Sequence, residues 1–89
     1  MNYSFTEDQW GQDLMHDEAT GKRCLLGHLY LSGRRGVLSG YLHLAVRALF
    51  PERVNDFAVV TGFNDHPDTT FEDVQLVWKH AVHALEEAA

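Results

Sequence analysis

Cysteine and histidine residues in two segments of the chain have the spacing of metal ligands. Cys24 and His28 are four residues apart and His80 and His83 are three apart, so each pair would share one face of a helix. Four such ligands suit a tetrahedral zinc ion. Against this, a cysteine with no second cysteine close by is usually a small buried hydrophobic residue. A metal- or ligand-binding regulatory protein is therefore the alternative function, and we expect no cofactor.

Cys24 is also the one thiol that could act as a nucleophile, with His28 or His66 as its base. A nucleophilic thiol has to be partly exposed and easily deprotonated. The run Cys24-Leu25-Leu26-Gly27 predicts a packed thiol instead. A cysteine-dependent enzyme is thus the third function considered, and we expect a protein that is not an enzyme.

The polar triplet Asn64-Asp65-His66 stands between an apolar Phe63 and Pro67. On a loop, such a triplet could form a binding or catalytic site. Asn and Asp side chains also bond to nearby backbone and shape turns. We expect this second role, with Asn64 and Asp65 tying the loop before the final helix to the rest of the fold. All three polar residues stay candidates for an interaction site.

Arg34 and Arg35, flanked by glycines, form the one concentrated basic loop of the chain. Together with Lys22 and Arg23 they hold four of the seven basic residues. A solvated loop is the simplest interpretation. The functional one is contact with an acidic protein surface or a phosphate, which guanidinium groups bind well. Both arginines are therefore interaction candidates.

The composition describes one small globular domain, spanning residues 1–89, in which 45% of the residues are hydrophobic. The net charge of −6 argues against nucleic-acid binding, which needs cations to displace phosphate counterions. No apolar run is long enough to span a membrane, and the N-terminus does not resemble a signal peptide. The single cysteine excludes an internal disulfide, so we expect a cytoplasmic protein.

The strongest helix signal covers residues 70–85. Thr70 can cap this helix, and Asp73 can complete a capping box. Thr69 with Glu72 fits the same pattern one residue earlier, so the sequence leaves two starts open. Apolar residues then recur at helical spacing: Val74, Val77, Trp78, Ala81, Val82 and Leu85. The run 24–32 favours a second helix, in which Gly27 indicates close packing against another backbone.

Two further helices are predicted over 41–50, with Ser39 as cap, and over 52–61, with Gly62 as the C-terminal stop. Together the segments predict a mainly α fold, a compact bundle of about four helices. The predicted core comprises Leu25, Leu29, Leu42, Ala45, Val46, Leu49, Phe57, Val74, Val77, Trp78 and Ala81.

The N-terminal segment, the part of the chain before Cys24, carries weaker signals. Ser4 and Glu7 could cap a short helix, after which Trp10 would anchor the segment to the body. Gly21 suits a turn, because glycine adopts positive φ at little cost. A short N-terminal β-hairpin around this turn is an open addition to the fold.

Two stretches resemble a family of small uncharacterised domains from actinobacteria and their phages. Residues 24–29, Cys-Leu-Leu-Gly-His-Leu, are similar to the family's Cys-x-x-Gly-Ala-Leu. Residues 63–67, Phe-Asn-Asp-His-Pro, followed by Thr70-x-x-Asp73-Val74, are similar to its Trp-Asn-Asp motif and closing helix. The resemblance implies a mostly helical fold and no established activity. His28 stands where the family has Ala, and Phe63 where it has Trp.

The leading function expected from these observations is a non-enzymatic protein-interaction module. The resemblance is to domains of actinobacteria and of their phages, so both a host and a phage origin stay open. A phage origin would fit action on a host protein. The expected partner is a protein rather than a nucleic acid or a membrane. A homodimer stays open as well, because the sequence does not fix the oligomeric state.

Overall fold

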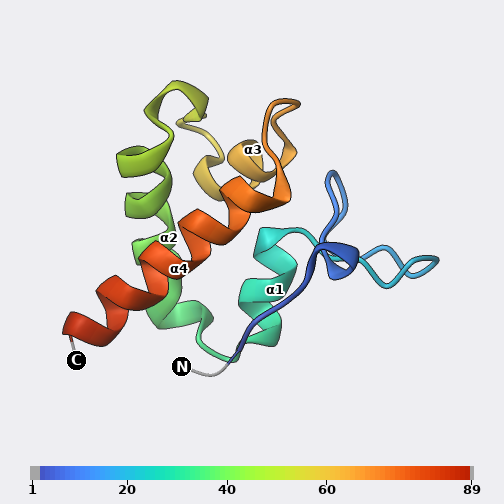
Figure 1. Cartoon of the computed structure of the whole chain (residues 1–89), viewed down its shortest axis with the longest axis horizontal. Helices are drawn as coiled ribbons and strands as arrows, with labels where there is room; N and C mark the ends of the chain where they lie inside the picture. Colours follow the sequence, from blue (N-terminus) through green and yellow to red (C-terminus); the bar gives the residue numbers. More distant parts are fainter. Residues whose placement is uncertain (1–2, 89) are drawn as a thin grey trace.

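Four α-helices and two short 3-10 helices form the fold in the computed structural model, which describes residues 3–88. The elements follow in the order η1 (Glu7–Gln9), α1 (Leu25–Leu31), α2 (Arg35–Leu49), η2 (Pro51–Arg53), α3 (Val59–Asp65) and α4 (Phe71–Ala88). α4 packs mainly on α2, and α1 and α3 lie beside this pair (Figure 1). The predicted mainly α-helical bundle of about four helices is confirmed.

α4 begins after Thr70, one of the two caps that the sequence allows. Thr70 Oγ1 accepts the N–H of Asp73 at 3.2 Å, and Asp73 Oδ2 accepts the N–H of Thr70 at 3.1 Å, which completes a capping box. Arg53 donates to the same Asp73 oxygen at 2.7 Å. One carboxylate therefore fixes both the start of α4 and the end of η2. The buried face of the helix comprises Val74, Val77, Trp78, Ala81 and Leu85.

Gly27 brings the N-terminal segment against α1. A Cβ atom on Gly27 would lie 2.3 Å from the carbonyl oxygen of Met15, a distance that no side chain tolerates. The close packing predicted for this glycine is confirmed, and the backbone that approaches it belongs to the N-terminal segment.

The N-terminal segment does not form the β-hairpin. Within residues 3–88, β pairing is limited to isolated bridges from Arg23 to Trp10 and to His16. The turn at Gly21 does form, with a φ of 76°. Each bridge joins a single pair of residues, so no continuous ladder of hydrogen bonds develops between residues 3 and 88.

The short helix η1 forms, but the prediction of its cap is wrong. Thr6 rather than Ser4 precedes the helix in an extended conformation, and the N–H of Thr6 donates to Gln9 Oε1 at 2.9 Å. Phe5 lies buried directly before this cap. The helix therefore starts after Phe5, where the aromatic side chain is already seated in the core.

α2 starts earlier than predicted. It begins at Arg35 instead of Tyr41, so that Ser39 lies inside the helix and does not cap it. The carbonyl of Arg34 accepts the N–H of Leu38 at 2.8 Å and so begins the helical hydrogen bonding. Leu38 is completely buried. Core packing therefore extends α2 into the segment expected to be a basic loop.

The prediction of one helix over 52–61 is wrong. η2 ends early, and a turn separates it from α3. In this turn, Asn55 Oδ1 accepts the N–H of Phe57 at 3.0 Å. Gly62 does not stop a helix but lies within α3, where a Cβ atom would approach Cβ of Asn55 to 2.8 Å. Gly62 thus serves close packing between the turn and α3.

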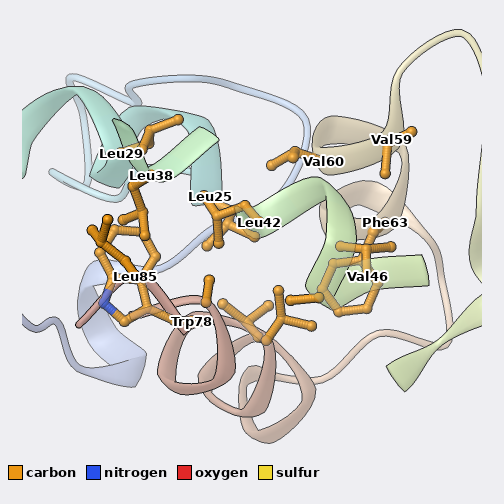
Figure 2. Packing of buried hydrophobic residues seen from close by; sticks show 14 of the residues in the cluster. Leu25, Leu29, Leu38, Leu42, Val46, Val59, Val60, Phe63, Trp78 and Leu85 are labelled. Carbon is orange, nitrogen blue, oxygen red and sulfur yellow. The ribbon is translucent and has the colours of Figure 1, made fainter. Parts of the chain in front are cut away.

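Most of the predicted core is buried: Leu25, Leu29, Leu42, Ala45, Val46, Val74, Val77, Trp78 and Ala81. The prediction is wrong for Leu49 and Phe57, whose exposed fractions are 39% and 101%. Phe50 packs inward in place of Leu49, with its ring centroid 5.1 Å from that of Phe63. Core residues that the sequence prediction missed include Leu38, Val59 and Val60 (Figure 2).

Candidate functional site

Asn64 lies in the last turn of α3 and is completely buried. Its Oδ1 accepts hydrogen bonds from Trp10 Nε1 at 2.6 Å and from the N–H of Leu25 at 2.9 Å. Its Nδ2 donates to the carbonyl of Gly11 at 3.2 Å and to Asp65 Oδ1 at 2.9 Å. The amide group therefore has a partner within the fold for both of its acceptor positions and both of its donors.

Asp65 extends this network to the N-terminal segment. Its Oδ1 also accepts the N–H of Asp13 at 2.8 Å, and Asp13 has a positive φ of 74°. Gln12 Nε2 donates to the carbonyls of Asn64 and His66, each at 3.0 Å. The triplet was expected on a loop, but Asn64 and Asp65 belong to α3. They tie α3 to the N-terminal segment. Their partners in this segment lie more than 50 residues earlier in the chain, so no local sequence pattern indicates them.

His28 is 3% exposed, and both of its ring nitrogens have partners. Nε2 lies 2.8 Å from the carbonyl oxygen of Gln9, and Nδ1 lies 2.7 Å from the hydroxyl of Tyr3. Because a carbonyl can only accept, we assign the proton to Nε2, so that Nδ1 accepts from Tyr3. The imidazole also stacks on Phe5, with ring centroids 3.8 Å apart. His28 therefore fastens the N-terminal segment to α1.

This arrangement predicts a pH-dependent stability. Burial lowers the pKa of His28; a nearby Arg23 also lowers it, and the bond to Gln9 opposes the shift. A histidine with a lowered folded-state pKa stabilises the fold above its unfolded value of about 6.5, and this stabilisation is lost as the pH falls through the folded pKa. The urea concentration at the midpoint of unfolding should therefore decrease as the pH is lowered from about 7.5 to about 5. The fall should be smaller in His28→Gln, whereas the exposed-site control His80→Gln should keep the wild-type slope.

The structure does not gather the four proposed metal ligands. Cys24 is buried and His28 is bonded on both nitrogens. His80 and His83 are exposed on α4, and His83 Nε2 lies 3.1 Å from Glu87 Oε1. Among residues 3–88, no three Cys, His, Asp or Glu side chains are arranged to hold a metal ion.

Cys24 is 5% exposed, which predicts slow reaction with a thiol reagent. In the native protein, labelling by a disulfide reagent should be at least about 100-fold slower than in urea, because it requires opening of the fold. Ala19→Cys places a thiol on an exposed loop and serves as the control that labels at once. Equal rates for Cys24 and the introduced cysteine would show that the native thiol is accessible.

Arg34 and Arg35 lie at the start of α2 and are exposed. The Arg35 guanidinium stands over the ring of Tyr30, 4.5 Å from its centroid. The start of α2 and the end of α3 lie at opposite ends of the bundle (Figure 1). The basic pair and the Asn64-Asp65-His66 triplet therefore do not form one site.

A hollow of about 360 Å³ opens between α1, α2 and the turn that enters α3. Its apolar lining includes Leu26, Leu29, Val59 and Val60. Its polar lining includes His43, Arg47 and Asp56, with Arg47 Nη2 3.2 Å from Asp56 Oδ1. We call this hollow the α1–α3 groove. It combines an apolar floor with charged groups at its rim, as small binding sites do.

Phe57 lines the α1–α3 groove, and its side chain is fully exposed. The backbone at this position is fixed, because Asn55 Oδ1 accepts the N–H of Phe57 and the Asn55 carbonyl accepts the N–H of Ala58, each at 3.0 Å. The sequence prediction missed this residue by placing it on the buried face of a helix. The turn-forming pair Asn55-Asp56 directly before it is the signal that indicates a turn instead.

Comparison with protein families matches residues 5–84 to a family of unknown function, DUF6197. Comparison with curated proteins and with solved structures finds no match for the chain. No helix in residues 3–88 combines the length and the apolar character needed to cross a membrane. The family match covers nearly all of the chain, and it agrees with the resemblance to an uncharacterised domain family. The chain belongs to the family of unknown function DUF6197.

Proposed function

We propose that the chain is a non-enzymatic protein-interaction module whose binding site is the α1–α3 groove. One observation carries the proposal: the fully exposed Phe57 at the edge of an apolar hollow. Burying a phenylalanine side chain stabilises a complex by about 1.5–3 kcal/mol. Aromatic anchors of this kind are enriched in protein interfaces. A partner that buries Phe57 would therefore gain binding energy. In the free chain the exposed side chain contributes no burial energy to the fold.

The occupant that fits this groove is a short protein segment with an apolar side chain beside a carboxylate. The apolar side chain would lie on the groove floor and against Phe57. The carboxylate would bind Arg47, which is only loosely held: Arg47 and Asp56 are 49% and 80% exposed. Such an exposed ion pair contributes about 0–1 kcal/mol, so a partner carboxylate can replace Asp56. His43, on the same side of the groove, supplies a further polar contact.

A phage origin and a host protein as the partner belong to this proposal as its finer form. They rest on the resemblance to domains of actinobacteria and their phages. A cytoplasmic location likewise rests on the single cysteine of the chain.

Selection from a displayed random-peptide library tests the proposal without knowledge of the natural partner. Selected peptides should share an apolar residue next to an acidic one and should bind in the micromolar range. Phe57→Ser should weaken their binding at least about tenfold, a loss of about 1.4 kcal/mol. Leu76→Ser removes an exposed apolar side chain at a separate site on α4 and should leave binding unchanged. Peptides that bind Phe57→Ser as well as wild type would overturn the proposal.

A further inference from the structure

Trp78 carries a ring N–H that has no hydrogen-bond partner. Within residues 3–88, its Nε1 is the one buried side-chain nitrogen or oxygen without a partner in the fold. The other tryptophan differs, because Trp10 Nε1 donates to Asn64 Oδ1 at 2.6 Å. A buried N–H without an acceptor costs free energy, and native folds leave few such groups. The unpaired N–H of Trp78 therefore indicates an acceptor that the chain itself does not supply.

The ring of Trp78 lines a hollow between α4 and the N-terminal segment. One wall is a stripe of α4 that includes Trp78, Lys79 and Val82, and the opposite wall is formed by Tyr3 and Ser4. The volume of the hollow is about 260 Å³, far more than one water molecule needs, so a ligand of several atoms fits. We call this site the Trp78 hollow. It shares no lining residue with the α1–α3 groove.

The ring nitrogen of Trp78 lies at the edge of the core. In Figure 2 it stands at the outer side of the buried side chains, away from Leu42 and Val46. The ring packs on Tyr3 and Phe5 of the N-terminal segment, with centroid distances of 6.0 and 5.3 Å. The unpaired N–H thus lies where α4 meets the N-terminal segment, beside the Trp78 hollow.

The N-terminal wall of the hollow is held loosely enough to move. Gln75 Nε2 donates to the carbonyl of Phe5 at 3.3 Å, which is longer than the usual range of about 2.7–3.2 Å. Ser4 is exposed, and no hydrogen bond within residues 3–88 holds it. Because Trp78 is 4% exposed, an acceptor reaches its Nε1 only after this wall has moved. The loose contacts of the wall make that movement small in cost.

Lys79 supplies the charge at this end of the hollow. It follows Trp78 directly in α4 and is exposed. Glu86, the acidic residue of the same stripe, stands seven residues further on, about 10 Å along the helix axis. His83 lies between them, and its Nε2 is 3.1 Å from Glu87 Oε1. The end of the hollow at Trp78 is therefore positive and favours an anion.

We propose that the Trp78 hollow binds a small carboxylic acid with an apolar body. One carboxylate oxygen accepts the N–H of Trp78, and the other pairs with the ammonium group of Lys79. A hydrogen bond to a carboxylate is stronger than one to a neutral acceptor, which favours an acid over other ligands. The apolar body lies between Val82 and the ring of Tyr3. This site is separate from the α1–α3 groove, so each proposal can fail without the other.

Nuclear magnetic resonance of the isotope-labelled chain tests the site, because each of the two tryptophans gives one indole N–H signal. Trp78→Phe assigns one signal by removing it; if this variant does not fold, Trp10→Phe removes the other. The probe is phenylacetate, a small acid with an apolar body. It should shift the Trp78 signal with a dissociation constant of about 0.1–1 mM and leave the Trp10 signal in place. No shift of the Trp78 signal up to about 10 mM, or equal shifts of both signals, would overturn the proposal.

Lys79→Gln tests the contact to the carboxylate. It should weaken the binding of phenylacetate at least about fivefold, through loss of the charge-assisted bond. The matched control Lys22→Gln removes the other lysine of the chain, which is exposed and outside the hollow, and should leave binding unchanged. The uncharged phenylacetamide should bind wild type at least about fivefold more weakly than the acid. Equal binding of acid and amide, or equal losses in both lysine variants, contradicts a carboxylate site.

Phe57→Ser separates this site from the α1–α3 groove, because phenylacetate also has the apolar and acidic character proposed for the peptide ligands of that groove. The Trp78 signal should shift in Phe57→Ser with the same dissociation constant as in wild type. If the variant loses this shift, the probe binds in the α1–α3 groove, and the proposal for the Trp78 hollow fails while the proposed function stands.

Discussion

Replacing Asn64 by alanine should destabilise the fold by about 3–5 kcal/mol, a large share of the 5–15 kcal/mol that holds a small domain together. The amide accepts from Trp10 Nε1 and from the N–H of Leu25, and it donates to the carbonyl of Gly11. Alanine would leave the buried N–H of Leu25 and the partly buried groups of Trp10 and Gly11 without their partner, at a cost of about 1–3 kcal/mol for each group that water cannot reach. Urea unfolding monitored by circular dichroism measures the loss.

Asn55→Ala makes the same chemical change at an exposed position and is the matched control. Within residues 3–88, the side chain of Asn55 makes one hydrogen bond, in which Oδ1 accepts the N–H of Phe57. Its loss should therefore cost about 1 kcal/mol or less. If Asn64→Ala were no less stable than Asn55→Ala, the network around Asn64 would not hold the N-terminal segment to α3.

Replacing Phe63 by alanine should destabilise the fold by about 3–5 kcal/mol, because the change leaves a cavity that the core cannot fill. Phe63 is completely buried and packs against Phe50. It lies on the side of α3 that faces the interior, one residue before Asn64. The measurement is the free energy of unfolding in urea at fixed temperature.

Phe57→Ala is the matched control, since it removes the same ring six residues earlier in the chain. Phe57 is 101% exposed, so its loss should change stability by less than about 0.5 kcal/mol. A loss of equal size in both variants would mean that Phe57 packs in the core and that the α1–α3 groove is not open as described.

The parts of the fold that local chemistry dictates could be predicted from the sequence. Thr70 and Asp73 lie three residues apart and bond to each other, so the start of α4 was predictable to within one residue. The bond from Arg53 to Asp73 comes from a distant segment and was not predictable. The apolar period of 70–85 likewise identified the buried face. The segment 52–61 also has apolar residues near helical spacing, but the hydrogen bonds of Asn55 favour a turn there.

The remaining features depend on contacts between distant segments. Gly62 suits a helix end and a close contact equally well in sequence, and only its approach to Asn55 decides between them. The partners of Asn64 include Trp10, 54 residues away, and no pattern within α3 indicates which segment would supply them. Turn chemistry suggested that Asn64 and Asp65 bind backbone, and it could not show that they bind the backbone of the N-terminal segment.

We propose that Asn64 and Asp65 hold the fold together and that the α1–α3 groove around Phe57 binds a short protein segment. Thermal unfolding and peptide binding, both measured on Asp65→Ala and on Phe57→Ser, test this claim most directly. Asp65→Ala should lose about 1–3 kcal/mol of stability, because its carboxylate bonds to Asp13 and Asn64, and should bind the selected peptides normally at a temperature where it is folded. Phe57→Ser should melt like wild type and lose binding. An unchanged melt with lost binding in Asp65→Ala, together with normal binding in Phe57→Ser, would contradict the claim and move the binding site to the Asn64-Asp65-His66 triplet.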